Sequence, residues 1–162
     1  VARWRKGFCV ARGTTISTPD GDRAVEDLTS GQQVWAFDVE SKKVVTANVL
    51  AIFTSQTDET ILINDRIRVT AEHPVFVTGG KGTWKSAAEV QVGDQLLTPE
   101  RKPVEVTSAK TVGGEIEVFD VAVDGPHNFF AGGLLVHNKS IAWTPKAFVP
   151  WYALWNRGPV KQ

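Results

Sequence analysis

Short runs of apolar residues alternating with polar ones recur through the middle of the chain, and no window carries a long amphipathic helix. Many runs are rich in Val, Ile, Thr and Phe, which favour strands. Turn-forming pairs lie between them, namely Asn64-Asp65, Gly79-Gly80, Gly113-Gly114, Asp124-Gly125 and Gly132-Gly133. The predicted strands cover residues 33–39, 44–53, 60–63, 67–70, 75–78, 95–98, 104–111, 116–123 and 128–136. Eight to ten strands at this spacing predict an all-β barrel or sandwich-like body. Residues 83–90 supply at most a turn or two of helix.

A weak internal repeat runs through this body. Residues 25–34 align with residues 87–96 at an offset of 62, which places Leu over Val, Gly over Gly and Gln over Gln. Matches of this length also arise by chance. If the repeat is real, it predicts two related β-units.

Composition narrows the class of protein. The chain has 162 residues, with 18 Lys and Arg against 18 Asp and Glu, so its formal net charge is zero. An electrostatic nucleic-acid binder would carry an excess of clustered basic residues. With 42% hydrophobic residues, the composition is that of one folded domain. No apolar run approaches the roughly 20 residues that span a bilayer. The chain begins with Val and contains no Met, so we expect a segment of a longer protein.

The two ends differ from the middle. Residues 1–8 are polar and basic, whereas residues 139–162 hold three of the six Trp, the only Tyr and three prolines. The apolar stretch 147–155 is broken by Pro150 and is too short to cross a membrane. It could pack on the body, on a partner or on a lipid surface, and we favour the start of a following domain.

Few residues can do covalent chemistry. They are Cys9, His73, Asp120, His127, His137 and Asn138, which include all three histidines and the only cysteine. A thiol hydrolase is one reading, but no helix follows Cys9 to lower its pKa. One Cys and three separated His also lack the paired spacing of a metal site, so we expect no structural zinc.

The arrangement favours chemistry on the chain itself. The thiol of Cys9 lies beside the carbonyl of Phe8, and attack there would turn that amide into a thioester. The fold must then distort the amide and protonate its departing nitrogen, for which Thr70 and His73 on one turn are a suitable pair. At the other end, the Asn138 amide can attack its own carbonyl and cut the bond to Lys139.

Two histidines would assist that second cut. His137 can polarise the Asn138 carbonyl, and His127 can accept a proton from the side-chain amide. Each residue also has an ordinary reading when it is taken singly: Cys9 as a buried apolar residue, Asp120 as a hydrogen-bond partner, Thr70 as a strand former, and His73 or His127 as a structural histidine.

Several ordered motifs resemble the Hint superfamily, which contains inteins, bacterial intein-like domains and hedgehog autoprocessing domains. They are CVARGT from Cys9, TAEHPVF from Thr70, FDVAV from Phe119, HNF from His127 and LVHN ending at Asn138. The match covers residues 9–138, or 130 of 162. It implies an all-β horseshoe with pseudo-twofold symmetry, with flanking segments 1–8 and 139–162. Only 46 residues separate His73 from Asp120, so no endonuclease domain fits.

The resemblance also implies roles for these residues. Cys9 would be the N-terminal nucleophile, and Thr70 and His73 would activate the scissile amide. Asp120 would assist proton transfer at Cys9 and couple the two ends. The C-terminal cut would use His127, His137 and Asn138.

One position departs from the splicing pattern. Inteins are followed by Cys, Ser or Thr, whereas Lys139 follows Asn138 here and Ser140 comes one residue later. The lysine side chain, with a reference pKa of about 10.4, is protonated at neutral pH and is a poor acceptor. A bacterial intein-like domain is therefore the closer match. We expect cleavage of both flanks, with ligation as a side reaction through the freed α-amine of Lys139.

The expected substrate is the chain's own flanking polypeptide, with water or a small thiol resolving the thioester. We expect a monomer with no cofactor, no metal, no nucleic-acid partner and no membrane span. We expect a bacterial host protein. The sequence leaves its compartment open, with secretion or the cell surface as candidates. Two alternatives stay open. One is a non-catalytic β-module of a larger surface protein, and the other is hedgehog-like transfer of the thioester to a sterol or other alcohol. The pair His137-Asn138 argues against the second alternative.

Overall fold

Thirteen strands and two single 3-10 turns make up the part of the chain that the structure describes. The structure is a computed structural model that describes residues 8–79 and 82–138. The strands are β1 Val10–Ala11, β2 Thr15–Thr18, β3 Gly21–Ala24, β4 Gln33–Asp38, β5 Lys43–Ile63, β6 Ile67–Val69, β7 Pro74–Val77, β8 Thr83–Ser86, β9 Gln95–Leu97, β10 Pro103–Glu105, β11 Ala109–Val123, β12 Asn128–Ala131 and β13 Leu134–His137. The 3-10 turns are η2 Val25–Asp27 and η3 Ala87–Glu89. The prediction of an all-β fold is confirmed.

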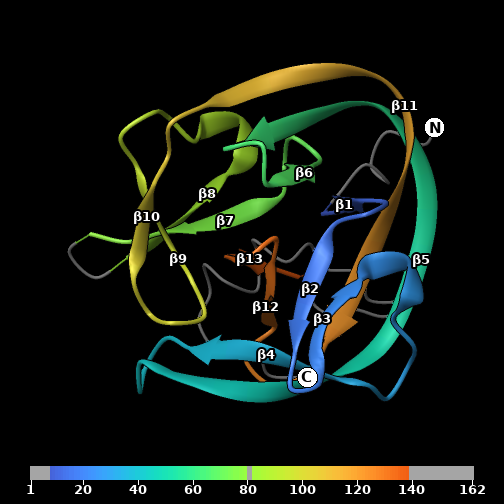
Figure 1. Ribbon diagram of the computed structural model, residues 1–162, viewed down its shortest axis with the longest axis vertical. Coiled ribbons are helices and arrows are strands. Elements are labelled where there is room, and N and C mark those ends of the chain that lie inside the picture. The colour runs from blue at the N-terminus through green and yellow to red at the C-terminus, as the bar shows by residue number, and fades with distance from the viewer. Residues whose placement is uncertain (1–7, 80–81, 139–162) are drawn as a thin grey trace, which may run out of the picture.

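The strands form two curled sheets. One has five strands in the order β11-β1-β6-β5-β4, and β11 also pairs with β5. The other follows the path β10-β9-β7-β13-β12-β2-β3, with β8 paired to β7. In Figure 1 the long strands β5 and β11 arch together around the outside, while the β12–β13 hairpin lies in the middle. This arrangement is the horseshoe that the motifs imply.

The two arching strands are longer than the sequence pattern predicts. Residues 44–53 and 60–63 belong to one strand, β5, because its polar middle pairs along β11. In β11, the pair Gly113-Gly114 falls at a register shift within the ladder and does not reverse the chain. A β-bulge absorbs the extra residues there and bends the strand. Polar residues and a Gly pair therefore mark the curvature of one continuous arch.

The shorter strands differ in the opposite direction. The single strand predicted at 128–136 is a hairpin of β12 and β13, and it reverses at Gly132-Gly133. A Cβ on Gly132 would lie 2.7 Å from the backbone oxygen of Arg66, and its φ is +58°, so only glycine fits this turn. The pattern does not predict strands β1, β2, β3 and β8: β1 has only two residues, and β3 and β8 are mostly polar. Residues 83–90 form β8 and the turn η3.

The internal repeat is present in three dimensions. Turns η2 and η3 begin at Val25 and Ala87, which are 62 residues apart, and β4 and β9 begin at Gln33 and Gln95 at the same offset. The amide of Gly31 donates to the carbonyl of Val49 at 2.7 Å, and that of Gly93 donates to the carbonyl of Val106 at 2.9 Å. The two β-units are therefore built on the same backbone pattern.

The repeat extends to the turn that carries two candidate catalytic residues. The amide of His73 donates to the carbonyl of Thr70 at 3.0 Å, and the amide of Thr14 donates to the carbonyl of Ala11 at 3.0 Å. These two turns lie side by side because β1 pairs with β6 through Val10 and Val69. The candidate site therefore forms where the two β-units meet.

A large apolar core of Val, Ile, Leu and Phe side chains fills the space between the sheets. A second cluster contains Phe37, Phe76, Leu97, Phe130 and Leu135, with Trp35 and Trp84 packed against it. The Asn128 side chain ties β12 to β4: its Oδ1 accepts from the Phe37 amide at 2.8 Å, and its Nδ2 donates to the Phe37 carbonyl at 2.9 Å. Within residues 8–79 and 82–138, no helix has the length and apolarity needed to cross a membrane.

Candidate active site

Cys9 lies in the middle of a row of residues across the five-stranded sheet. In the β1–β11 ladder, Val10 pairs with Phe119 and Ala11 with Val118, so the same register continued by one residue sets Cys9 opposite Asp120. On the other side, the amide of Thr70 donates to the Cys9 carbonyl at 3.0 Å. The Cys9 side chain is 2% exposed. This burial shields the thiol from bulk water.

The amide nitrogen of the Phe8-Cys9 bond is held by Thr70. This amide donates to the Thr70 hydroxyl at 3.0 Å, and the hydroxyl lies 3.4 Å from the Cys9 carbonyl. Thr70 is 1% exposed, so water does not compete for these bonds. The ring of Phe8 meets the ring of His73 edge-on, with the centroids 6.2 Å apart.

The imidazole of His73 joins the two ends of the domain. Its Nδ1 lies 3.2 Å from the carbonyl oxygen of Cys9, and its Nε2 lies 2.8 Å from the carbonyl oxygen of His137. Burial lowers the pKa of His73 to about 4, so the ring is neutral at pH 7. Carbonyl oxygens only accept, and a neutral ring has one N–H, so His73 donates to one of the two carbonyls at a time.

At the C-terminal end, β13 delivers His137 and Asn138. The amide of Asn138 donates to the carbonyl of His127 at 2.9 Å. The Nδ1 of His137 lies 2.5 Å from the Asn138 carbonyl oxygen, and since that oxygen only accepts, Nδ1 carries the proton. Burial lowers the pKa of His137 to about 4, so the donor is a neutral imidazole.

His127 sits at the start of β12 in a left-handed backbone conformation, with φ of +58°. Its amide donates to Asp124 and its Nδ1 donates to the Val123 carbonyl at 2.9 Å. When the ring carries a single proton, and that proton is on Nδ1, its lone pair lies on Nε2. Non-glycine residues adopt this conformation at a cost and tend to do so where the fold fixes a functional group.

The structure brings five of the predicted residues into one chain of contacts: Cys9, Thr70, His73, His137 and Asn138. Asp120 lies opposite Cys9 if the β1–β11 register continues by one residue. The carbonyl of His127 accepts from the amide of Asn138. Lys139 and the stretch 147–155 lie outside the described residues. Sequence reasoning missed the contact between His73 and the His137 carbonyl, and it missed Trp84, whose ring lies 5.0 Å from that of His137. An isolated Trp in a short strand carries no signal for such a contact.

Within the described residues, no group of three or more His, Cys, Asp or Glu side chains is arranged to hold a metal ion.

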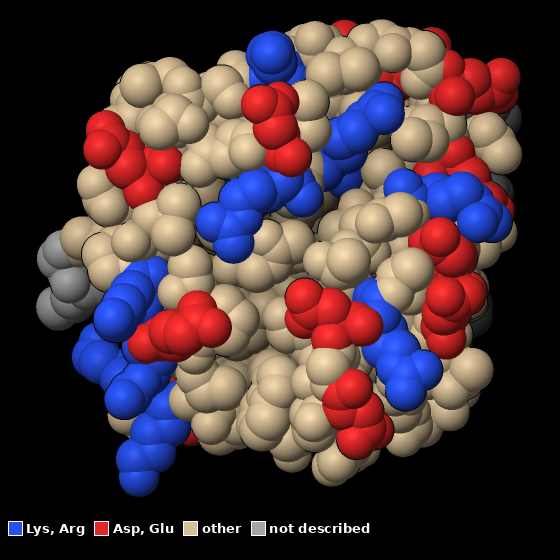
Figure 2. Space-filling view, in the orientation of Figure 1, with Lys and Arg blue, Asp and Glu red and all other residues tan. Residues whose placement is uncertain are grey.

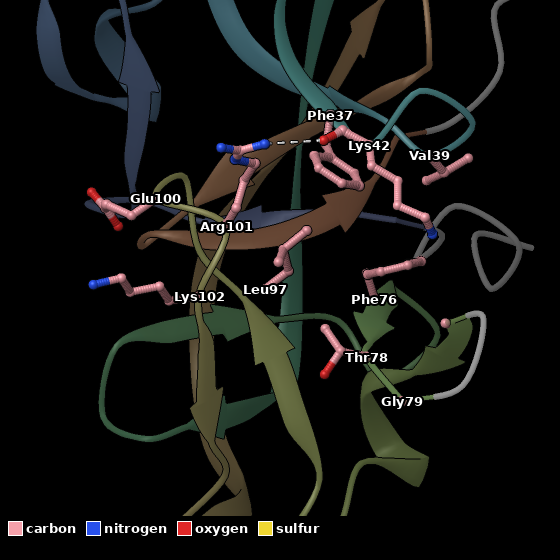
Figure 3. Close-up of a pocket in the computed structure, with 11 residues that line it drawn as sticks. Phe37, Val39, Lys42, Phe76, Thr78, Gly79, Leu97, Glu100, Arg101 and Lys102 are labelled. Carbon is pink, nitrogen blue, oxygen red and sulfur yellow. Dashed lines mark hydrogen bonds between the residues drawn. The ribbon is translucent and has the colours of Figure 1, made fainter.

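A shallow cavity of about 470 Å³ lies away from the reactive residues. Phe37, Phe76 and Leu97 point into it, and the Arg101 guanidinium contacts the Lys42 carbonyl at its rim (Figure 3). Figure 2 shows basic side chains gathered at the lower left, where Figure 1 places the β4–β5 and β9–β10 turns.

The two buried histidines predict a pH dependence of folding. Their folded-state pKa of about 4 lies below the unfolded value of about 6.5, so the unfolded chain binds more protons between these pH values. We expect the free energy of unfolding to fall as pH drops from about 6.5 to about 4, by on the order of 3 kcal/mol for each histidine. Urea unfolding of the Cys9→Ala/Asn138→Ala chain between pH 4 and pH 8 measures it.

The matched control replaces both rings with uncharged amides, as His73→Gln/His137→Gln. This variant should show a flatter profile in the same window. Carboxylates with a lowered pKa, such as Asp94, also contribute to the free energy of unfolding. That contribution is lost mainly below about pH 4. An unchanged slope between pH 4 and pH 6.5 in the control would show that other groups cause the dependence.

Known proteins place this geometry in a family. The family described as the pretoxin Hint domain matches residues 15–143. A bacterial intein-like domain from Clostridium thermocellum is 28% identical with a TM-score of 0.74, covering 81% of this chain and 99% of that one. A DnaB intein from Synechocystis sp. PCC 6803 is 25% identical with a TM-score of 0.68, covering 80% and 97%. The TvoVMA intein, at 19% identity, shares the fold with a TM-score of 0.70, covering 80% and 97%. No curated protein matches the chain.

These similarities confirm the resemblance that the motifs carry. The Hint fold of inteins and intein-like domains implies autoprocessing, in which a domain acts on its own flanking polypeptide. The match to the family covers most of the chain. This protein is therefore a member of the pretoxin Hint domain family.

Proposed function

We propose that residues 9–138 form a single-turnover domain that cuts its own chain at two bonds, Phe8-Cys9 and Asn138-Lys139. One observation carries this proposal above the others. The ring of His73 contacts the carbonyl of Cys9 with one nitrogen and the carbonyl of His137 with the other. Two peptide segments that are far apart in sequence, each next to a candidate scissile bond, therefore meet at one buried imidazole.

The N-terminal cut begins with an N–S acyl shift. The Cys9 sulfur attacks the carbonyl carbon of Phe8, the C–N bond breaks, and the proton of the thiol passes to the nitrogen, giving a thioester and a free amine. As this nitrogen becomes pyramidal it gains a lone pair, to which the Thr70 hydroxyl at 3.0 Å can turn its proton. Asp120, which lies opposite Cys9 if the β1–β11 register continues by one residue, would relay the thiol proton.

The C-terminal cut is the cyclisation of Asn138. Its side-chain nitrogen attacks its own carbonyl carbon, the bond to the Lys139 nitrogen breaks, and that nitrogen takes up a proton, leaving a succinimide. The Nδ1–H of His137, 2.5 Å from the carbonyl oxygen, stabilises the negative charge that develops there. The lone pair on Nε2 of His127 is the base that would accept a proton from the attacking amide.

The residue after Asn138, Lys139, decides which group accepts the acyl group of the thioester. Its side-chain amine is protonated at neutral pH and does not accept the acyl group. Water or a small thiol therefore resolves the thioester, and ligation of the flanks is a minor product. Since the family is described as the Hint domain of pretoxins, we infer that the C-terminal cut serves to free the polypeptide beyond Asn138.

Thr70→Ala is expected to slow the N-terminal cut by about 10- to 100-fold, because the amide nitrogen loses its hydroxyl partner. Thr70→Ser keeps the hydroxyl and should recover most of the rate. Release of an N-terminal tag, with added thiol in the Asn138→Ala chain, measures this cut alone. A Thr70→Ala chain that releases its tag at the parent rate would contradict the role given to this hydroxyl.

Hydroxylamine tests the proposal against both alternatives. It converts a thioester at Phe8 into a hydroxamate, so the Asn138→Ala chain should release an N-terminal fragment ending in a Phe8 hydroxamate. An intact chain with no hydroxamate would favour the non-catalytic β-module. Transfer of the fragment to an added sterol or other alcohol, in preference to thiol or water, would favour the hedgehog-like reaction.

A further inference from the structure

Trp84 lies against the imidazole of His137. The two ring centroids are 5.0 Å apart and the ring planes meet at 88°. Strand β8 pairs with β7 through Trp84 and Phe76, and β7 pairs with β13 through Val75 and Val136. Trp84 therefore contacts His137 across the intervening strand β7.

The indole of Trp84 also contacts a second aromatic ring. The ring of Phe76 lies 5.0 Å from it at an angle of 65°, and the ring of Phe37 lies 6.4 Å from that of Phe76. The backbone at Gly82 closes over Phe76 so tightly that a Cβ there would collide with the Phe76 ring. Edge-to-face aromatic contacts of this kind have a preferred geometry, so the row presents the indole to His137 in a fixed orientation.

The orientation of His137 decides whether its ring can act on Asn138. Rotation about the last side-chain torsion of histidine has a broad, roughly twofold energy profile, so the torsion alone does not select one ring orientation. A half-turn of the ring would replace Nδ1–H by a C–H group at the Asn138 carbonyl and remove the hydrogen bond there. The hydrogen bond to the Asn138 carbonyl favours one of the two orientations, and the side chains packed against the ring add to that preference.

We propose that Trp84 is a positioning residue for the C-terminal cut, because its indole fixes the imidazole of His137 with Nδ1–H directed at the Asn138 carbonyl. The inference rests on the proposed function and deepens it. Trp84 contacts His137, so it acts on the cleavage rate through the orientation of that ring. It has no equivalent action on the Phe8-Cys9 bond.

The chain offers a matched control in Trp35. This residue lies on β4, is partly buried, and packs against the same aromatic cluster as Trp84. Trp35→Leu therefore removes a comparable ring from the same cluster. Trp84→Leu keeps apolar bulk at the position but removes the ring, whereas Trp84→Phe keeps an aromatic ring. Comparing the three variants separates the effect on His137 from a general loss of packing.

Cleavage is measured separately at the two ends of a chain with a folded tag on each. In the Cys9→Ala background, Trp84→Leu should slow the C-terminal cut by at least about tenfold, and Trp84→Phe should recover most of the rate. In the Asn138→Ala background, the thiol-dependent N-terminal cut should stay within about twofold for every variant, as should the C-terminal cut for Trp35→Leu. Equal slowing of both cuts by Trp84→Leu, or equal slowing by Trp35→Leu, would overturn the inference.

A spectroscopic measurement decides the inference without cleavage. In the uncleaved Cys9→Ala/Asn138→Ala chain, nitrogen-15 NMR of His137 should show a neutral ring protonated at Nδ1, and Trp84→Leu should shift it toward a mixture of ring states. An unchanged His137 signal in Trp84→Leu would overturn the positioning role. If the parent chain shows no C-terminal cut, the proposed function fails, and the His137 signal still decides whether Trp84 orients the ring.

Discussion

Replacing Asn138 with alanine is expected to abolish cleavage of the Asn138-Lys139 bond while leaving the thiol-dependent N-terminal cut in place. Alanine carries no nucleophile, and no external group gains the proximity that an adjacent side-chain amide has to its own carbonyl. We expect the C-terminal rate to fall by at least about 1,000-fold. Mass spectrometry of a chain tagged at both ends, sampled over hours, measures the loss.

The control for this substitution is Asn138→Gln, which keeps an amide but sets it one methylene further from the carbonyl. This variant should cleave more slowly than the parent chain and faster than Asn138→Ala. A C-terminal fragment starting at Lys139 that appears at the parent rate from the Asn138→Ala chain would contradict cyclisation as the mechanism.

Replacing Cys9 with alanine is expected to have an effect of the same size at the other end. The sulfur is the only thiol of the chain and lies next to the carbonyl of Phe8, so its loss removes the acyl shift altogether. We expect no thiol-dependent release of the N-terminal tag, a loss of at least about 1,000-fold, and continued cyclisation of Asn138. Time courses of the two tagged fragments measure both effects in one sample.

The conservative variant Cys9→Ser tests the nucleophile itself. A hydroxyl can attack the same carbonyl but is the weaker nucleophile at neutral pH, so this chain should form an ester slowly and release its tag with hydroxylamine. Release of the N-terminal tag from Cys9→Ala at the parent rate would show that another group opens the Phe8-Cys9 bond.

Much of the candidate site can be predicted from the sequence, because the chemistry requires rare residue types at the two ends of the domain. The only cysteine, the three histidines and a His-Asn pair stand out against a background of strand formers. Their order along the chain is enough to indicate one family. Their contacts are not, because Cys9, His73 and His137 meet through hydrogen bonds between residues 64 positions apart.

The fold, too, can be predicted from the sequence only in part. Alternation of apolar and polar residues predicts strands where one face is buried, as at β4. It fails along β5, where residues 54–59 stay extended although most of them are polar, because pairing with β11 supplies their backbone hydrogen bonds. It also fails at β1, where two residues between a nucleophile and a turn are too few to show a period.

The most direct test of two-ended autoprocessing is the intact mass of the freshly made 162-residue chain with a small folded tag on each end, followed with and without added thiol. Two-ended autoprocessing should give three species. They are an N-terminal fragment that is released faster when thiol is added, a core ending in an Asn138 succinimide, and a C-terminal fragment beginning at Lys139. A tagged chain whose mass stays unchanged under both conditions would contradict the account, because the fold would then be present without the chemistry.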